Sequence, residues 1–299
     1  MRILVAGGQG QVGSALEQQG IEQGLDLVAL GRADLDICSE ESIASAFDKY
    51  QPDLLINAAA YTAVDKAESE PELAYAINET ATGLLADACA ARDIPMLHIS
   101  TDYVFDGTKD SPYVETDPVN PIAVYAKSKE AGERALRERL ERHIILRTSW
   151  VFGLQGNNFV KTMVRLAKDR DRLTVVADQF GGPSSARGIA EALLTIAAQY
   201  QSGSKVAWGT YHYCQKPYVS WHEFAQAVVA RAIELGLVDH EVEVAPIPSS
   251  EFPTPVVRPK NSRLDTNALA AAFGVKDSEW ALDVDQVLES LMSSQTATA

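Results

Sequence analysis

Tyr125 and Lys129 are the residues whose types and spacing most directly suggest chemistry. They lie four positions apart in a segment with helical spacing, so both side chains would share one face of a helix. A free tyrosine has a pKa of about 10, and an ammonium group beside it lowers that pKa by favouring the phenolate. A phenol tuned in this way can donate a proton to a carbonyl oxygen near neutral pH. Taken alone, the pair is common by chance, and a surface helix with a stray aromatic would look the same.

Thr101 follows a short apolar run, at a position where a strand would end. Open α/β sheets bind ligands beyond the carboxyl ends of their strands, so the Thr101 hydroxyl could reach the oxygen that Tyr125 protonates. His98 lies inside the same run, where a structural role is the simpler interpretation. Thr101, Tyr125 and Lys129 therefore predict acid–base chemistry at a carbonyl group.

A glycine-rich turn near the N-terminus suggests what acts with these residues. The segment reads Gly7-Gly8-Gln9-Gly10-Gln11-Val12-Gly13 and directly follows the first apolar run. Glycines allow a tight turn and a close approach of the backbone to a pyrophosphate, which the N-terminus of the next helix then attracts. The position of the motif predicts a dinucleotide site that includes Gly7, Gly10 and Gly13. A tight strand–helix turn without a ligand is the alternative.

Arg32 bears on the choice of dinucleotide. An acidic residue about 20 positions after the motif would bind the ribose 2′-hydroxyl of NAD(H). The second apolar run ends instead at Gly31-Arg32, and Arg32 could pair with the 2′-phosphate of NADP(H). Asp36 is better placed for the adenine side. We therefore expect NADP(H) to be preferred, with NAD(H) left open and a solvated surface arginine as the alternative for Arg32.

The surrounding sequence alternates β-branched apolar runs with helical patterns. Nearly continuous apolar strands are typical of a parallel sheet covered by helices on both faces, and the alternation predicts right-handed βαβ units. The expected strands are 3–6, 27–30, 54–58, 96–100 and 144–149, and the expected helices are 12–24, 40–50, 71–91 and 125–141. The fold class is therefore α/β, a Rossmann-type doubly wound parallel sheet.

The regular alternation loosens after residue 150. Residues 1–150 are predicted to form the dinucleotide-binding domain, and residues 151–292 a smaller, mainly substrate-binding region whose chain could cross back to the sheet. The small polar residues of 293–299 predict a flexible tail.

Composition excludes several classes of protein. The 299 residues carry a net charge of −15, which disfavours nucleic-acid binding because phosphates require basic partners. The three cysteines form no metal or disulfide pattern. No apolar run reaches the ~20 residues that span a bilayer, and the N-terminus has no signal-peptide core. We expect a cytoplasmic protein without membrane contact.

Several blocks of sequence together carry a resemblance. The chain resembles the extended short-chain dehydrogenase/reductases and, among them, the dTDP-4-dehydrorhamnose reductases. The matching blocks are 7–13, 57–68, 100–107, 125–129, 147–151, 156–159, 178–181 and 258–264, and the last four are specific to the subfamily. The resemblance implies reduction of dTDP-4-dehydro-6-deoxy-L-mannose to dTDP-L-rhamnose, for bacterial cell-surface polysaccharide.

The resemblance also implies roles for individual residues. Thr101, Tyr125 and Lys129 would be the catalytic set, and Tyr125 and Lys129 would also contact the cofactor. The further cofactor contacts would be Gly10, Gln11, Val12, Asp36, Ile37, Ala60, Tyr61 and Thr62. The contacts to the dTDP-sugar would be Thr101, Asp102, Tyr103 and Trp150. Some members are magnesium-linked dimers, but segment 183–187 offers no acidic residue, so we predict no metal site and leave a homodimer open.

Arg258, Lys260 and Arg263 form a local basic segment in an acidic chain. Arginine can meet a diphosphate with two hydrogen bonds, so these three residues are predicted to bind the substrate's diphosphate. A basic loop on a mixed surface is the alternative.

Other functions share part of this pattern. A sugar-nucleotide 4,6-dehydratase needs Thr-Asp-Glu where this chain has Thr101-Asp102-Tyr103, which disfavours elimination. Another sugar-nucleotide reductase, or an epimerase that returns its hydride to the same sugar, would look similar. A non-catalytic, NADP-binding subunit like the regulatory subunit of methionine adenosyltransferase also resembles this family.

Overall fold

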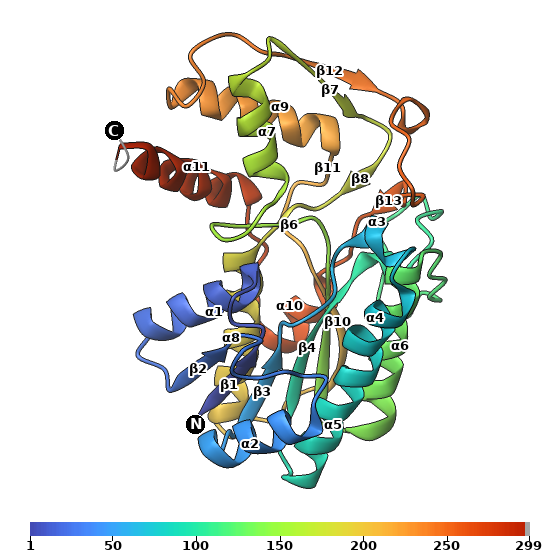
Figure 1. Cartoon of the computed structure of the whole chain (residues 1–299), viewed down its shortest axis with the longest axis vertical. Coiled ribbons are helices and arrows are strands. Elements are labelled where there is room, and N and C mark those ends of the chain that lie inside the picture. Colours follow the sequence, from blue (N-terminus) through green and yellow to red (C-terminus); the bar gives the residue numbers. More distant parts are fainter. Residues whose placement is uncertain (297–299) are drawn as a thin grey trace.

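The computed structural model describes residues 1–296, and residues 297–299 lie outside the described part. Its centre is a six-stranded sheet in which neighbouring strands run parallel, in the order β10-β5-β4-β3-β1-β2 (Figure 1). The strands are β1 (Ile3–Ala6), β2 (Leu27–Leu30), β3 (Leu54–Asn57), β4 (Met96–Thr101), β5 (His143–Thr148) and β10 (Gly209–Tyr213). The predicted doubly wound, Rossmann-type sheet is confirmed.

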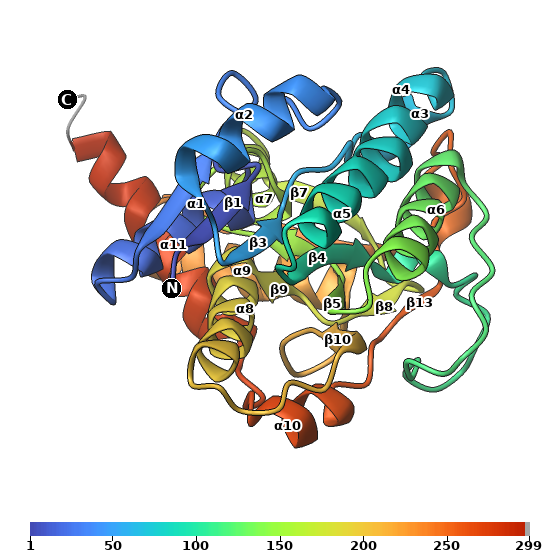
Figure 2. The ribbon, with the colours of Figure 1, turned by 90° about the horizontal axis from the view of Figure 1, so that it is seen from below.

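Helices cover both faces of this sheet. Ile3 and Val5 pack with α1 (Gln11–Glu22) and α8 (Ala186–Gln201), whereas Leu4 packs toward the opposite face. That face is covered by α2 (Glu40–Tyr50), α5 (Ala81–Ala91) and α6 (Val124–Arg139), and α5 and α6 lie side by side in Figure 2. Side chains at alternate strand positions thus pack into two separate hydrophobic cores, one on each face of the sheet. This explains why the strands are apolar at successive positions.

The segment predicted as one helix over 71–91 is helical throughout, but its hydrogen bonding changes in the middle. The helical prediction is confirmed, with a π-helical turn (Ala76–Thr80) between α4 (Pro71–Tyr75) and α5. Asn78 in this turn is buried, and its side chain bonds to the backbone of Tyr61 and to the Ser128 hydroxyl. The π turn therefore places a polar side chain between two segments that the site requires. A short helix, α3 (Val64–Ala67), precedes α4.

The second half of the chain has a core of its own. Buried residues of α7 (Phe159–Lys168), α9 (Trp221–Glu234) and α11 (Trp280–Thr296) pack together, in the upper part of Figure 1. Strands β7 (Arg172–Val176) and β12 (Glu243–Ile247) pair beside them. The remaining elements are β6 (Val151–Phe152), β8 (Phe180–Gly181), β9 (Ser184–Ser185), β11 (Val219–Ser220), β13 (Asn261–Ser262), α10 (Asn267–Phe273) and the 3₁₀ turns Asp102–Val104 and Ser249–Glu251.

The two halves share the central sheet. Strand β10 pairs with β5 at one edge, and α8 packs on the face that α1 also covers, although both come after residue 150. Helix α11 continues to Thr296, inside the segment predicted to be a flexible tail, and the rest of that segment, 297–299, lies outside the described residues. No helix within 1–296 has both the length and the apolar character to cross a membrane.

Candidate active site

The glycine turn lies where the strand order reverses, between β1 and β3. Gly7 has a φ of +86°, and a Cβ there would lie 2.6 Å from the backbone nitrogen of Ala59, in the loop after β3. A Cβ at Gly13 would lie 2.1 Å from the Gly7 carbonyl oxygen. Side chains at these two positions would push the loops and α1 apart. The turn therefore needs glycine to bring backbone from two strands to the switch point, where such sheets bind ligands.

The N-terminus of α1 is open to an anion. Its N-cap is Gly10, which has no side chain to cap the first turn, and the first turn contains no acidic residue. Its unpaired N–H groups and the positive end of the helix dipole therefore face outward with no carboxylate competing for them. This arrangement fits a pyrophosphate. Val12 and Gly13 are buried, so they would contribute backbone rather than side-chain contacts.

A cavity of about 260 Å³ adjoins this turn and is lined by six of the thirteen predicted cofactor residues. Its lining includes Gly7, Gly10, Arg32, Asp36, Ile37 and Ala60. Arg32 is exposed, and the Asp36 carboxylate accepts a hydrogen bond from the backbone of Cys38, 3.0 Å away. The cavity has the apolar and polar parts that the adenosine end of a dinucleotide requires.

Tyr61 and Thr62 continue from this cavity toward α6. Asn78 accepts a hydrogen bond from the Tyr61 nitrogen (2.9 Å) and donates to the Ser128 hydroxyl (2.9 Å), next to Lys129. The Tyr61 hydroxyl donates to Glu70, which also pairs with Lys66. Asn78 thus fixes the loop after β3 to the helix that carries Tyr125 and Lys129. Sequence reasoning missed Asn78, although a polar, weak helix-former inside a helical pattern was a signal.

Tyr125 and Thr101 meet at the carboxyl end of β4. Tyr125 lies in the first turn of α6 and is 8% exposed, and the Thr101 hydroxyl beside it favours the charged form of its phenol. The Tyr103 ring packs edge-on against it, with ring centroids 5.8 Å apart. Burial raises the pKa of the Tyr125 phenol, and Thr101 only partly opposes this rise. The phenol is therefore protonated near neutral pH, and its activation by Lys129 stays a prediction.

Lys129 is buried beneath Tyr125 on the same helix. Its Nζ donates to the Ile99 carbonyl oxygen at 2.8 Å and lies 3.3 Å from Nε2 of His98. Burial lowers the pKa of Lys129 to about 8, while Glu133 one turn further along α6 favours the charged form. Lys129 is thus held by His98 and Ile99, two residues of β4 that the sequence analysis placed inside a strand.

Asp102 is a buried carboxyl group beside Thr101. Its Oδ1 accepts the Thr101 hydroxyl at 3.1 Å, and its Oδ2 has no hydrogen-bond partner among the described residues. Burial raises the pKa of Asp102 to about 6, although Ser262 and Thr101 favour the charged form. Because Thr101 has one hydroxyl proton, it can donate that proton to Asp102 or to the Tyr125 oxygen, but not to both at once.

The predicted diphosphate residues have separate partners. Arg258 pairs with Asp65 at 2.6 Å and donates to the Tyr103 hydroxyl at 3.1 Å, which brings it close to Tyr125. Arg263 instead donates to Asn261 and to the Asp110 carbonyl, in the loop after β4. Lys260 is exposed. Of the three, Arg258 has the most direct connection to the candidate active site.

Trp150 has an unusual backbone conformation. Its φ is +50°, a left-handed value that is uncommon outside glycine and often marks a functional site. The indole stacks on Trp221, with ring centroids 3.5 Å apart, and lies against Gly181, where a Cβ would be 2.6 Å from the ring. The sequence pointed to Trp150 but not to Trp221, which begins α9 and offers no local signal.

Comparison with known proteins decides which family has this arrangement. The family described as RmlD substrate binding domain matches residues 1–293. The chain belongs to this family. A dTDP-4-dehydrorhamnose reductase of Aggregatibacter actinomycetemcomitans is 44% identical over 280 residues, which are 93% of this chain and 95% of the relative. The resemblance inferred from the sequence blocks is confirmed.

Solved structures agree with this placement in the RmlD substrate binding domain family. A dTDP-4-dehydrorhamnose reductase of Clostridium acetobutylicum superposes with a TM-score of 0.89 at 36% identity, over 98% of this chain and 100% of that one. A Bacillus anthracis dTDP-4-dehydrorhamnose reductase in complex with NADP gives a TM-score of 0.87 at 33% identity, over 96% and 98% of the two chains.

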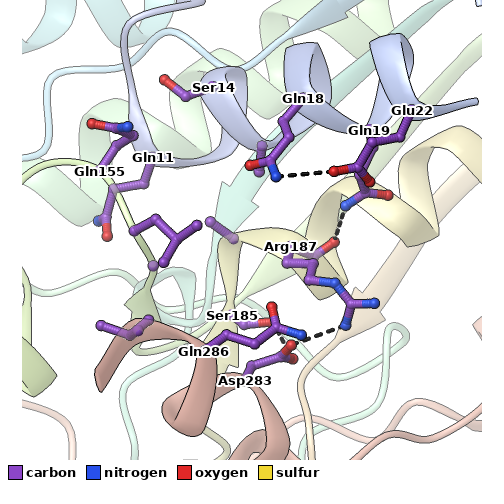
Figure 3. Close-up of a pocket in the computed structure, with 15 residues that line it drawn as sticks. Gln11, Ser14, Gln18, Gln19, Glu22, Gln155, Ser185, Arg187, Asp283 and Gln286 are labelled. Carbon is purple, nitrogen blue, oxygen red and sulfur yellow. Dashed lines mark hydrogen bonds and ion pairs between the residues drawn. The ribbon is translucent and has the colours of Figure 1, made fainter. Parts of the chain in front are cut away.

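This member of the RmlD substrate binding domain family has another cavity, of about 320 Å³, between α1, α8 and α11 (Figure 3). Arg187 and Asp283 form an ion pair in it, and Gln19 donates to the Arg187 carbonyl. Gln11 also lines it and accepts a hydrogen bond from Asn158. Thr101, Tyr125 and Lys129 do not line this cavity, so we assign no step of the reaction to it.

Proposed function

We propose that this protein reduces the C4 ketone of dTDP-4-dehydro-6-deoxy-L-mannose to give dTDP-L-rhamnose. The observation that carries the proposal is the meeting of a protonated, buried phenol (Tyr125) with Thr101, at the end of β4 in a sheet with a glycine-built anion site. Membership of the RmlD substrate binding domain family and relatives named dTDP-4-dehydrorhamnose reductase support the choice of substrate.

A nicotinamide dinucleotide fits the residues present. The uncapped start of α1 would hold its pyrophosphate, and the cavity lined by Arg32, Asp36 and Ile37 would hold its adenosine end. Lys129 and Tyr61 would contact its other half. When bound, it supplies the hydride that the C4 carbon accepts. We further propose NADPH as the preferred form, because exposed Arg32 can pair with a 2′-phosphate and the Bacillus anthracis relative is in complex with NADP.

The chain's own residues would supply the proton and the orientation. Tyr125 would give its phenol proton to the C4 oxygen as that oxygen gains charge, because a protonated phenol can act as a general acid. Thr101 would position both the phenol and the carbonyl oxygen. Lys129 would stabilise the phenolate that is left, since a nearby cation favours the charged form.

The substrate contacts come from both halves of the chain. Trp150, braced by Trp221, would cover the sugar, and Arg258 would meet the diphosphate through bidentate hydrogen bonds. To do so, Arg258 would exchange its contact with Asp65 for one with the ligand. Asp102 and Tyr103 would line the sugar site beside Thr101, and Lys260 and Arg263 would add positive charge at its edge.

The test is NADPH oxidation with dTDP-4-dehydro-6-deoxy-L-mannose, followed by identification of the sugar. We expect one NADPH consumed for each dTDP-L-rhamnose formed. An epimerase would convert sugar without net loss of NADPH, and a different 4-keto-sugar reductase would act better on another ketone. A regulatory subunit would bind NADPH, turn over no sugar nucleotide and recover a protein partner in a pull-down. A cytoplasmic location and a homodimer stay predictions.

A further inference from the structure

A chain of hydrogen bonds beneath the candidate active site starts at a backbone group that can only donate. The Ala59 N–H points at Oδ1 of Asn57, 3.1 Å away. This contact fixes the orientation of the Asn57 amide, because the opposite orientation would place its NH₂ group against another N–H donor. Nδ2 of Asn57 therefore faces inward as a donor, toward the ring of His98.

The orientation of Asn57 determines the tautomer of His98. Nδ2 of Asn57 lies 3.1 Å from Nδ1 of His98, so Nδ1 must accept and carries no proton. A neutral imidazole with an unprotonated Nδ1 has its proton on Nε2. His98 has no exposed surface, and burial holds its pKa well below the usual range, so the ring is neutral.

The Nε2–H of His98 faces Nζ of Lys129 at 3.3 Å. A neutral amine has a lone pair that can accept this hydrogen bond, whereas an ammonium group has three donors and no acceptor. The other contact of Nζ, to the Ile99 carbonyl oxygen, is satisfied by either form. An ammonium group here would face the Nε2–H of His98, which is a contact between two donors. If His98 changed its tautomer to avoid this, the donor–donor contact would instead form between His98 and Asn57, or between Asn57 and Ala59.

Several charged and titratable groups surround these hydrogen bonds. Glu133 faces Lys129 from the next turn of α6 and is itself paired with Arg147 of β5 and Arg137 of α6. His143, at the start of β5, lies near His98 and also opposes a positive charge there. Two positive partners therefore share the Glu133 carboxylate, which limits how strongly Glu133 can hold Lys129 in the charged form.

We propose that Asn57 and His98 are positioning residues for Lys129, forming a directional relay that presents an N–H donor to Nζ and so favours the neutral amine. Lys129 is then not a permanent cation: the relay favours its neutral form, and the stabilisation of the phenolate proposed above uses its charged form. The lowered pKa of Lys129 agrees with this relay. Its use in catalysis rests on the proposed function, but the state of Lys129 and His98 does not.

Asn57→Asp is the variant that reverses the relay without changing its size. One oxygen of the new carboxylate still accepts the Ala59 N–H, and the other accepts a proton from Nδ1 of His98. Nε2 of His98 then becomes an acceptor, which suits an ammonium group on Lys129. Asn157→Asp, which adds the same charge in an exposed loop, is the matched control.

The tautomer of His98 is measured by ¹⁵N NMR of the ring nitrogens in the full chain without added nucleotide. The chain has five histidines, so His98→Gln assigns the signal. We expect the Nε2–H tautomer in the unsubstituted protein and in Asn157→Asp, and the Nδ1–H tautomer in Asn57→Asp. An Nδ1–H or charged ring in the unsubstituted protein overturns the proposal, even if Asn57→Asp does not fold. A folded Asn57→Asp that keeps the Nε2–H tautomer also overturns it.

The second readout is the titration of Lys129 Nζ, followed by ¹⁵N NMR and assigned with Lys129→Gln. We expect its pKa to rise in Asn57→Asp by at least about one unit, because the variant favours the charged amine. The basic limb of the kcat profile for sugar reduction should move in the same direction. If the chain reduced no sugar at any pH, the proposed function would fail, while both NMR measurements would still decide the relay.

Discussion

Two buried carboxyl groups differ in their surroundings: Glu133 in α6, the helix that carries Tyr125 and Lys129, and Asp102 in the turn after β4. Glu133 accepts two hydrogen bonds from the guanidinium of Arg147, at 2.9 and 2.7 Å, and these partners hold its pKa below the usual range. Asp102 has no cationic partner, keeps one oxygen without a hydrogen bond among the described residues, and has its pKa raised to about 6. Both are buried to a similar extent.

The difference separates a group that holds the fold from a group that is available to the site. Glu133 is fully paired, so it joins α6 to β5 and has no capacity left for a ligand. Asp102 lies at the ligand-binding end of β4, where an unpaired buried carboxyl costs free energy unless a substrate or a proton satisfies it. The protein tolerates this cost at Asp102, beside Thr101 and Tyr125. It avoids the cost at Glu133, which is paired with Arg147.

Tyr125→Phe should give the largest effect on activity and little on the fold. We expect kcat to fall by about 10²–10⁴-fold, the usual contribution of a general acid, while KM changes less. Steady-state kinetics with NADPH and the 4-keto sugar measures this. Tyr211→Phe removes a phenol that, among residues 1–296, donates to the Ala207 carbonyl, and serves as the control. Full kcat in Tyr125→Phe would remove this residue from the mechanism.

Glu133→Gln should act on stability, in contrast to Tyr125→Phe. It leaves the buried charge of Arg147 without its carboxylate, and breaking such a pair costs about 3–5 kcal/mol of unfolding free energy. Urea denaturation followed by circular dichroism measures the loss. A variant as stable as the parent protein would show that the ion pair does not hold α6 to β5.

Asp102→Asn should stabilise the protein and impair it. The pKa of Asp102 is raised from 3.8 to about 6 in the folded state, so the unfolded state loses the proton first and stability falls as pH rises from about 4 to 6. At pH 7 the variant should therefore be more stable by up to about 3 kcal/mol, and the gain should vanish near pH 4. Melting temperatures at both pH values test this, together with a lower kcat/KM. A gain independent of pH would contradict it.

Arg32→Ala should give the smallest of these effects, outside both carboxyl regions. Losing one exposed contact to a 2′-phosphate should raise KM for NADPH by roughly tenfold, the worth of one charge-assisted hydrogen bond, and leave KM for NADH nearly unchanged. Comparison of the two KM values checks the prediction. An unchanged ratio would leave the choice of cofactor to other residues.

The sequence was sufficient where local rules determine the structure. The glycine turn, the five apolar strands before residue 150 and the helix that carries Tyr125 and Lys129 all follow from spacing and residue type. Helix α2 matches its prediction at both ends, since Ser39 caps it and Tyr50 ends it before a left-handed residue.

Other features depended on contacts between distant segments and could not be read locally. In the π turn, the Asn78 side chain bonds to Tyr61 and Ser128, 17 and 50 positions away. Arg258 and Arg263 looked alike in the sequence but bind Asp65 and the Asp110 carbonyl, respectively. The role of His98 depends on Asn57, on a neighbouring strand. Such pairs are set by sheet order and register rather than by the residues beside them.

The most direct test of the account follows the hydride itself. NADPH carrying two deuterium atoms at C4 of the nicotinamide is incubated with dTDP-4-dehydro-6-deoxy-L-mannose, and the product is examined by mass spectrometry and NMR. We predict one deuterium per product molecule, at C4 of the sugar, with one NADPH consumed. An unlabelled product, or deuterium at any other carbon, would contradict the account.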